Sequence, residues 1–394
     1  MHVDHPDSSS VSIAIIGAGP VGLSLALLAA AQLPNAHITT YDARQADHNV
    51  HEDPRTLALS LGSIQLLQRL QTWSAAKAQP ILTVNISQQQ PSLIPPATVQ
   101  ISAQEMQAPM LGAVISYGNV LGPLQQRWLE MVHNHPQRFH ACFGHKVKDI
   151  RTLPDGQVEV DAQVLKNYDL VIVAEGGIFS EQVKKPVVSD YHQNGWIGTV
   201  TLEQPLNGMA FERFTANGPA ALLPIGMHEA ALVWCQPSDH DEVATLTQTQ
   251  RLAVLNTMFP PEAGRLTAVS DLKSFALGLN AERTLVHGRT VRIGNAAQTL
   301  HPVAGQGLNL GLRDAYVLVE QLARHENIDQ ALKRAAFSRL PDRWGVMGVT
   351  ELLARGFTWD VPLLPELRNL GLGAMQKISP LRRLLARRMM FGWR

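Results

Sequence analysis

The stretch from residue 12 to residue 42 constrains the fold of this chain more than any other. A short apolar strand runs into a glycine turn, an alanine- and leucine-rich helix closed by a proline, and a second strand. The segments are Ser12–Ile16, Gly17–Gly22, Leu23–Leu33 with Pro34, and His37–Tyr41. This order is typical of a βαβ unit in a parallel sheet.

The glycines of the turn and the acid after the second strand have separate physical roles. Gly17 permits the turn, Gly19 lets a pyrophosphate approach the backbone, and Gly22 lets helix and strand pack closely. Asp42 follows the last glycine by about 20 residues, where its carboxylate can accept hydrogen bonds from ribose hydroxyls. Glycines alone are a weak signal, and a purely structural βαβ unit is the alternative. Together, these features predict a dinucleotide site.

A second glycine-rich stretch lies late in the chain, between residues 292 and 311. A short β-branched run, Thr290–Ile293, stops at Gly294, and a loop containing Pro302, Gly305 and Gly307 leads into a helix near Leu308. One face of this helix is apolar, with Leu308, Leu312, Ala315, Leu318 and Leu322. A bare helix N-terminus favours negative charge, so this stretch predicts a site for an anionic or electron-rich group. A simple glycine-rich connection is the alternative.

The overall composition excludes several protein classes. The 394 residues, 45% of them apolar, suffice for two domains or one elaborated α/β unit. The 33 Lys and Arg balance the 33 Asp and Glu, which argues against a nucleic-acid binder. Cys142 and Cys235 suggest a reducing compartment. The polar start is unlike a signal peptide, and no apolar run reaches the roughly 18 residues that span a bilayer. We therefore expect a cytoplasmic protein.

Further strand-like and helical runs predict how the rest is organised. Strands are expected at Arg138–Val147, Val158–Asp161, Asp169–Ala174, Val187–Leu202, Ala210–Phe214, Ala220–Pro224 and Ala230–Trp234, and helices at Ile64–Trp73, Leu121–Val132 and Glu242–Phe259. The predicted fold is α/β: a Rossmann-type cofactor-binding domain (11–79, 116–185, 286–330) interleaved with a mixed β-sheet substrate domain (80–115, 186–285) and followed by a helical C-terminal segment (331–394). With one glycine fingerprint after a strand, one dinucleotide should bind stably.

Two regions leave alternatives open. The group His133, His135, His140, Cys142 and His145 matches no usual zinc spacing, and a strand explains it more simply than a metal site. The C-terminal run 377–394 mixes leucines, methionines and arginines. It predicts a basic amphipathic helix that either lies on an anionic membrane or packs its apolar side on the protein and exposes its arginines.

Taken together, these motifs resemble those of the single-component flavin aromatic hydroxylases, the p-hydroxybenzoate hydroxylase superfamily. The matching segments run over nearly the whole chain: Gly17–Gly22, Asp53–Arg55 followed by Ala58–Ser60, Asp169–Gly176, Phe211–Phe214 with Gly218–Pro219, and Gly294–Asp314. The segment Gly294–Pro302 is similar to one branch of that group, the ubiquinone-biosynthesis hydroxylases that act on polyprenyl-methoxyphenols.

The resemblance implies FAD as the bound cofactor. It places the first three glycines at the pyrophosphate, Asp42 at the adenosine ribose and Arg55 near the cofactor, although an ordinary surface arginine is the alternative for Arg55. Asn295 stands where most members carry Asp, and Glu175 is one methylene longer than the usual Asp. The full set of implied cofactor-binding residues is Gly17, Gly19, Gly22, Asp42, Arg44, Arg55, Val147, Glu175, Gly176, Asn295, Gly305, Gly307, Leu308 and Asn309.

The resemblance also implies a reaction. NAD(P)H, a transient co-substrate, reduces the flavin; O2 then adds as a C4a-hydroperoxide, and one oxygen atom passes to a lipidic phenol. The helix start at Gly307 and Leu308 would stabilise the reduced flavin, and Pro302 would shape the wall beside it. His301 is a candidate for handling the phenol proton, with a purely local hydrogen-bonding role as the alternative. Expected contacts to the substrate ring are Phe211, Phe214 and Leu223.

Several functions remain compatible with these motifs. A flavin hydroxylase of another small aromatic, a prenyl reductase, or a flavin-binding accessory protein of a quinone-biosynthesis assembly would carry much of the same sequence. The Trp-x-Trp-x-Ile-Pro signature of flavin halogenases is absent from the sequence, which disfavours that class. If the basic C-terminal helix contacts lipid, the protein is expected on the inner face of the plasma membrane.

Overall fold

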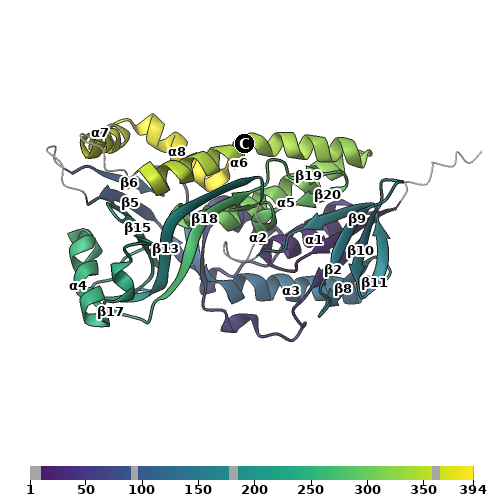
Figure 1. Cartoon of the computed structure of the whole chain (residues 1–394), viewed down its shortest axis with the longest axis horizontal. Coiled ribbons are helices and arrows are strands. Elements are labelled where there is room, and N and C mark those ends of the chain that lie inside the picture. The colour runs from purple at the N-terminus through teal and green to yellow at the C-terminus, as the bar shows by residue number, and fades with distance from the viewer. Residues whose placement is uncertain (1–9, 90–95, 177–184, 357–363, 394) are drawn as a thin grey trace, which may run out of the picture.

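The structure, a computed structural model, describes residues 10–89, 96–176, 185–356 and 364–393. Figure 1 shows a parallel sheet with its helices in one half, a large, mostly antiparallel sheet in the other, and a long helix, α6 (Ile328–Gly356), running along both. The predicted α/β architecture is confirmed.

The parallel sheet contains the predicted βαβ unit. Its order is β19-β20-β12-β1-β2-β8, and every neighbouring pair is parallel except β19 with β20. The strands are β1 (Val11–Ile16), β2 (Ala36–Asp42), β8 (Phe139–Phe143), β12 (Leu170–Val173), β19 (Val286–His287) and β20 (Thr290–Arg292). A three-stranded sheet, β9 (Asp149–Thr152), β10 (Val158–Ala162) and β11 (Val164–Tyr168), shares an apolar core with one face.

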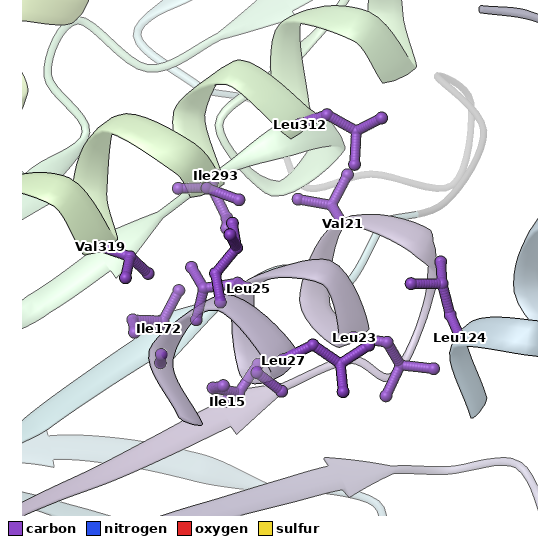
Figure 2. Packing of buried hydrophobic residues seen from close by; sticks show 14 of the residues in the cluster. Ile15, Val21, Leu23, Leu25, Leu27, Leu124, Ile172, Ile293, Leu312 and Val319 are labelled. Atoms are coloured by element: carbon purple, nitrogen blue, oxygen red, sulfur yellow. The ribbon is translucent and has the colours of Figure 1, made fainter. Parts of the chain in front are cut away.

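Helices cover the other face of the parallel sheet. They are α1 (Pro20–Gln32), α3 (Tyr117–Asn134) and α5 (Gln306–Arg324). Because α1 lies between strands and helices, it is apolar all round, and Leu23 and Leu25 are fully buried. Figure 2 shows α1 packed between Ile15 and Ile172 of the strands and Leu312 of α5. The predicted apolar face of α5 is buried here.

The large sheet is built from segments far apart in the sequence. Its order is β21-β18-β13-β16-β15-β14-β5-β6, with β17 on β13. The strands are β5 (Thr83–Gln88), β6 (Thr98–Ser102), β13 (Val187–Leu202), β14 (Met209–Thr215), β15 (Gly218–Pro224), β16 (Glu229–Pro237), β17 (Leu266–Val269), β18 (Lys273–Ala281) and β21 (Gln298–Thr299). Helix α4 (Gln248–Met258) packs on one face. The opposite face meets α6, α7 (Leu364–Lys377) and α8 (Ser379–Phe391).

Two local details differ from the sequence-based prediction. Helix α2 (Leu61–Arg69) ends before Trp73, because Gln71 adopts a left-handed conformation with φ of 60°. Within the predicted range 80–115, only β5 and β6 join the large sheet. The segments β4 (Gln79–Ile81) and β7 (Gly112–Ser116) pair with each other, and β7 also pairs with β3 (Thr56–Ser60).

The contact between α1 and α5 depends on a glycine. A Cβ atom at Gly311 would lie 2.8 Å from Cα of Gly294 and 2.8 Å from Cγ2 of Val21. We expect Gly311→Ala to lower the free energy of unfolding by about 1–3 kcal/mol through overpacking, measured by urea denaturation. Gly348→Ala in α6, where a Cβ meets nothing within 4 Å, is the matched control and should be neutral or stabilising. Equal unfolding midpoints for both variants would contradict a rigid contact.

Candidate active site

Three loops meet at the carboxyl ends of β1, β12 and β20. A Cβ at Gly17 would lie 2.6 Å from the backbone nitrogen of Glu175, and one at Gly176 would lie 2.5 Å from Cβ of Asn295. Gly294 in turn faces Val21 of α1, with its notional Cβ 3.3 Å from the Val21 side chain. The early and the late glycine stretches are therefore neighbours in the fold, at the sheet edge where α/β proteins bind ligands.

The N-terminus of α1 is open to a ligand. Gly19 is the N-cap residue and no side chain caps the helix, while Pro20 occupies the first turn. A Cβ at Gly19 would meet only the hydroxyl of Tyr117, at 3.9 Å. At Gly22, by contrast, a Cβ would lie 1.9 Å from the carbonyl oxygen of Gly17. Gly17, with φ of 100°, permits the turn, and Gly22 permits the close packing of helix and strand. Gly19 leaves room at a helix end that favours anions.

Asp42 lies beside this loop at the end of β2. Its Oδ2 accepts from the backbone N–H of Ala18 at 2.7 Å, and its Oδ1 accepts from the N–H and Nε of Arg44 at 2.8 and 3.0 Å. Arg44 also donates through Nη2 to the carbonyl oxygen of Ala18 at 2.8 Å. The carboxylate is therefore oriented toward the glycine turn by groups on both sides of it.

Arg55 lies on the same side of the site. Its guanidinium donates to Asp53, with Nη2 2.6 Å from Oδ2, and stands 4.2 Å from the ring centre of Tyr117. Burial acts to raise the pKa of Asp53, but the hydrogen bonds from Arg55 outweigh it and hold that pKa below its usual value. Because the Tyr117 hydroxyl faces Gly19, these residues place a cation near the open end of α1. The sequence analysis did not identify Tyr117 as a site residue.

The N-terminus of α5 forms the second open end. Gly305 adopts a left-handed conformation with φ of 58°, and its notional Cβ would lie 3.1 Å from Cβ of Ala58 in β3. No side chain caps the helix, and a Cβ at Gly307 would meet nothing within 4 Å. Pro302 turns the chain into this helix, and its carbonyl accepts from the N–H of Gly305 at 2.9 Å. Two uncapped helix ends with open glycines fit a ligand carrying a diphosphate and an electron-rich ring, as FAD does.

The side chain of Asn309 is fully engaged within the protein. Its Oδ1 accepts from the N–H of Ser60 at 2.8 Å and the hydroxyl of Ser63 at 2.7 Å. Its Nδ2 donates to the carbonyl oxygens of Ala58 and Gly305, both at 2.9 Å. This side chain therefore fastens the start of α5 to β3 and α2, and only its backbone is available to a cofactor.

Of four other residues predicted to bind the cofactor, two pack against apolar clusters and two lie at the ends of strands or in the late loop. Val147 is half-buried against the core between the parallel and the three-stranded sheets. Leu308 packs partly against the main core in the first turn of α5. Glu175 is exposed at the end of β12, and the carbonyl oxygen of Asn295 accepts from Nζ of Lys185 at 3.2 Å. All four remain predictions as FAD contacts.

Both ring nitrogens of His301 form hydrogen bonds with other groups of the protein. Its Nδ1 accepts from the N–H of Val303 at 3.1 Å, so Nε2 carries the proton and donates to Oε1 of Gln193 in β13 at 3.0 Å. The ring also meets that of Tyr191 edge-on, with centroids 5.1 Å apart. Burial lowers the pKa of His301 to about 3, so the ring is neutral across the physiological range. Of the two roles considered, the local hydrogen-bonding role matches this geometry.

An apolar cavity of about 120 Å³ opens beside the start of α5. Its walls come from β3, from the large sheet, from β4 and β7, and from the C-terminal helix. The lining residues include Ala58, Leu59, Ile81, Val84, Ile86, Ile101, Leu111, Gln306, Asn309, Ala386, Met389 and Met390. Because almost all of these side chains are apolar, the cavity suits an aromatic or aliphatic group and excludes water.

The predicted ring contacts divide between the two faces of the large sheet. Leu223 packs against the cluster that contains Ile81 and Met390, on the cavity side. Phe211 packs on the opposite face against the α4 cluster, contrary to the expectation, because side chains alternate along β14. Phe214 is 1% exposed and is not among the residues that line the cavity.

Glu212 is a titratable group that the sequence analysis did not single out. It pairs in register with Ile86, which lines the cavity, and is half-buried. Burial raises the pKa of Glu212 to about 8, so its carboxyl holds a proton at neutral pH. The sequence did hint at a buried acid here, because Glu212 stands between apolar residues in a predicted strand.

A buried polar network, also missed from the sequence, braces the late loop. Asp314 of α5 accepts from Nε2 of Gln298 at 2.9 Å and from Nε of Arg339 in α6 at 2.7 Å. Arg343 donates to Oε1 of Gln298 at 2.8 Å. The loop between β20 and α5 is thus held by ion pairs as well as by packing. The sequence did contain a sign of this network, because charged residues stand among the apolar residues of α5 and α6.

The histidine-rich region contains the predicted strand. Within it, β8 pairs with β2, and the ring of His135 meets that of Phe139 edge-on at 5.9 Å. Among the described residues, no group of three or more His, Cys, Asp or Glu side chains could hold a metal ion.

Known proteins resemble this chain over most of its length. The family model described as "FAD binding domain" matches residues 10–347. The chain is 29% identical over 390 residues to the 3-demethoxyubiquinol 3-hydroxylase of Escherichia coli (strain K12), covering 94% of this chain and 96% of that protein. It is 30% identical over 399 residues to the ubiquinone hydroxylase UbiL of Rhodospirillum rubrum, covering 96% and 89%.

A solved structure shares the fold. The p-nitrophenol 4-monooxygenase PnpA from Pseudomonas putida DLL-E4 superposes with a TM-score of 0.75 at 15% identity, over 97% of this chain and 98% of that one. The arrangement of open helix ends, the family match and the near-full-length relatives agree. This chain belongs to the FAD-binding monooxygenases of the p-hydroxybenzoate hydroxylase superfamily and is related to the ubiquinone-biosynthesis hydroxylases.

Proposed function

We propose that this enzyme hydroxylates the ring of a polyprenylated (methoxy)phenol in ubiquinone biosynthesis, using NAD(P)H and O2. The observation that carries the proposal is the apolar cavity at the N-terminus of α5, where Gln306 and Asn309 meet Ile86 and Met390. A phenol ring in this cavity would lie next to the open helix end at which the flavin ring is expected. Relatives named for ubiquinone hydroxylation support the choice of substrate class.

FAD, when bound, supplies the redox chemistry that activates O2 with electrons from NAD(P)H. The residues of the chain bind and shield it. The first N–H groups of α5, beginning at Gly307 and Leu308, have no side-chain cap and would stabilise negative charge on a flavin ring held there. The apolar wall, including Ile86 and Met390, would keep water from the reacting atoms. Glu212 holds a proton on the same face, whereas His301 holds its proton on Nε2 against Gln193.

The open space at Gly307 allows a clean test of cofactor placement. We expect Gly307→Val to fold normally, because a Cβ there meets nothing within 4 Å, but to lose at least about tenfold in FAD affinity as the side chain enters the cofactor's space. Flavin absorbance and fluorescence titration of the purified apoprotein measure this. Gly348→Val, equally open but in α6, is the control. Wild-type affinity in Gly307→Val would remove the flavin ring from the start of α5.

Substrate-stimulated turnover tests the reaction itself. We expect a polyprenylated methoxyphenol to stimulate NAD(P)H oxidation by the FAD-loaded enzyme and to gain one oxygen atom from 18O2, detected by mass spectrometry. An enlarged side chain on the sheet wall of the cavity, Val84→Phe, should abolish the stimulation while FAD remains bound. An enzyme that binds FAD but never oxidises NAD(P)H would instead indicate an accessory protein. Stimulation only by small soluble phenols would indicate another aromatic hydroxylase.

The C-terminal helices support a further part of the proposal, contact with a membrane surface. Helix α8 packs on the protein through Ala386 and Met390, both buried, yet Leu381 and Leu384 are 46% and 52% exposed. Exposed arginines accompany them on the same helix, and Leu367 and Leu370 of α7 are exposed nearby. None of the described helices is long and apolar enough to cross a bilayer. A basic, partly apolar surface suits the headgroup region of an anionic membrane, where a polyprenylated substrate resides.

Vesicle binding tests this surface. We expect the full-length protein to float with liposomes containing anionic lipid, and the double variant Leu381→Asp/Leu384→Asp to lose most of that binding. Leu165→Asp, at an equally exposed leucine of β11, is the control and should float like the wild type. If the α8 variant and the control float equally, α8 does not contact lipid.

A further inference from the structure

A second cavity, of about 370 Å³, lies between α5, α6 and the C-terminal turn. Its lining includes Arg313, Tyr316, Arg324, Arg339, Phe391 and Trp393, and it shares no lining residue with the apolar cavity. The volume is within the range of roughly 300–1,000 Å³ that is usual for small-molecule sites. Three arginines, three aromatic rings and one carboxylate, Glu320, which pairs with Arg324, line the cavity. The excess of guanidinium groups is suited to a ligand that carries an anionic group.

The buried charges behind this cavity do not cancel. Arg313 donates through Nε to Oδ2 of Asp342 at 2.8 Å, and Arg339 donates to the same oxygen at 2.6 Å and to Asp314 at 2.7 Å. Arg343, also buried, donates to neutral groups, namely the side chain of Gln298 and a backbone carbonyl. Three buried guanidinium groups therefore face two buried aspartates, which leaves one positive charge in excess.

Among the described residues, this excess positive charge remains when the neighbouring ion pairs are included. Arg292 pairs with the carboxylate of Glu282 at 2.5 Å, and Arg324 on the cavity wall pairs with Glu320 at 2.9 Å. Each of these pairs is neutral. An uncompensated charge in a buried setting is costly, and a bound anion would offset that cost.

Among the described residues, three guanidinium nitrogens of this group have no hydrogen-bond acceptor. They are Nη1 and Nη2 of Arg313 and Nη2 of Arg339, all buried. The two side chains are only 8% and 4% exposed, and both residues line the cavity. Buried N–H donors are almost always satisfied in folded proteins, so these three call for an acceptor within the cavity. Phosphate oxygens accept from guanidinium groups in the paired geometry that Arg313 presents.

We propose that this cavity is a binding site for a phosphate group, either the free ion or a phosphate ester. The site also contacts the end of the chain. A Cβ at Gly392 would lie 2.8 Å from Cδ of Arg313, and the N–H of Trp393 donates to Oδ1 of Asp342 at 3.2 Å. The cation of Arg388 stands 3.9 Å from the ring centre of Trp393. Bound phosphate would thus hold the turn that follows α8, the helix whose Met389 and Met390 line the apolar cavity.

Calorimetric titration of the full-length, FAD-loaded protein tests the site, because the cofactor then occupies its own phosphate-binding groups. At constant ionic strength we expect inorganic phosphate to bind with a stoichiometry of one. Arg313→Gln should weaken binding at least about tenfold, and Arg324→Gln on the cavity wall should weaken it by a smaller factor of about two to five. Arg127→Gln, an exposed arginine of α3, is the control and should bind phosphate like the wild type.

Two further measurements distinguish the outcomes. NADP+ binding in competition with phosphate, with no competition from NAD+, would identify a nucleotide phosphate as the ligand. Competition from neither would show that the site binds phosphate but not a pyridine nucleotide. Absence of phosphate binding to the wild type, or unchanged binding to both Arg313→Gln and Arg324→Gln, would overturn the proposal. If Arg313→Gln does not fold, the phosphate titrations of the wild type and of Arg324→Gln still test the proposal. The assignment of the hydroxylation reaction does not depend on the result.

Discussion

The close approach of α1 and α5 is the constraint on which the rest of the structure depends. Val21 meets Gly294 and Gly311, and the absence of side chains at these two glycines lets two helix starts, nearly 290 residues apart in the sequence, lie next to each other. Each of these helix ends is uncapped, and each carries a glycine that leaves open space, Gly19 in one and Gly307 in the other. A single extended cofactor can therefore contact both ends, which neither stretch could achieve alone.

Packing alone does not hold the late loop in place. The loop between β20 and α5 also pairs with the large sheet through β21, and His301 donates to Gln193 within that sheet. Ion pairs through Asp314 tie the same region to α6. The loop therefore connects the cofactor side, the sheet side and the C-terminal helices, and the apolar cavity lies where these three parts meet. Such cross-linking would hold a cofactor bound at α5 and the apolar cavity at a fixed distance from each other, which the proposed hydroxylation requires.

The environments of three side chains could not be predicted from the sequence, and the physical cause is the same for each. Phe211 was predicted on the cavity side, but one residue of alternation along β14 sends it to the α4 side. Asn309 has its side chain satisfied by partners about 250 residues away in β3 and α2. His301 is neutral because of burial, which a sequence does not display. In each case the role depends on which neighbours the tertiary structure supplies.

The sequence by itself determined the two glycine-rich turns that precede α1 and α5. Glycines at set intervals between a strand and a helix have few conformational alternatives, so Gly17, Gly19 and Gly22 and the late Gly305 and Gly307 were identified directly. Most strands of the parallel sheet were also predicted, since apolar runs are a local property, whereas β9, β11, β17 and β18 were not. Only the tertiary structure decided which faces meet: that α8 forms a cavity wall through Met389 and Met390, and that three buried arginines face two aspartates. These features arise from contacts between segments far apart in the sequence, and a local sequence pattern does not indicate which distant segments come into contact.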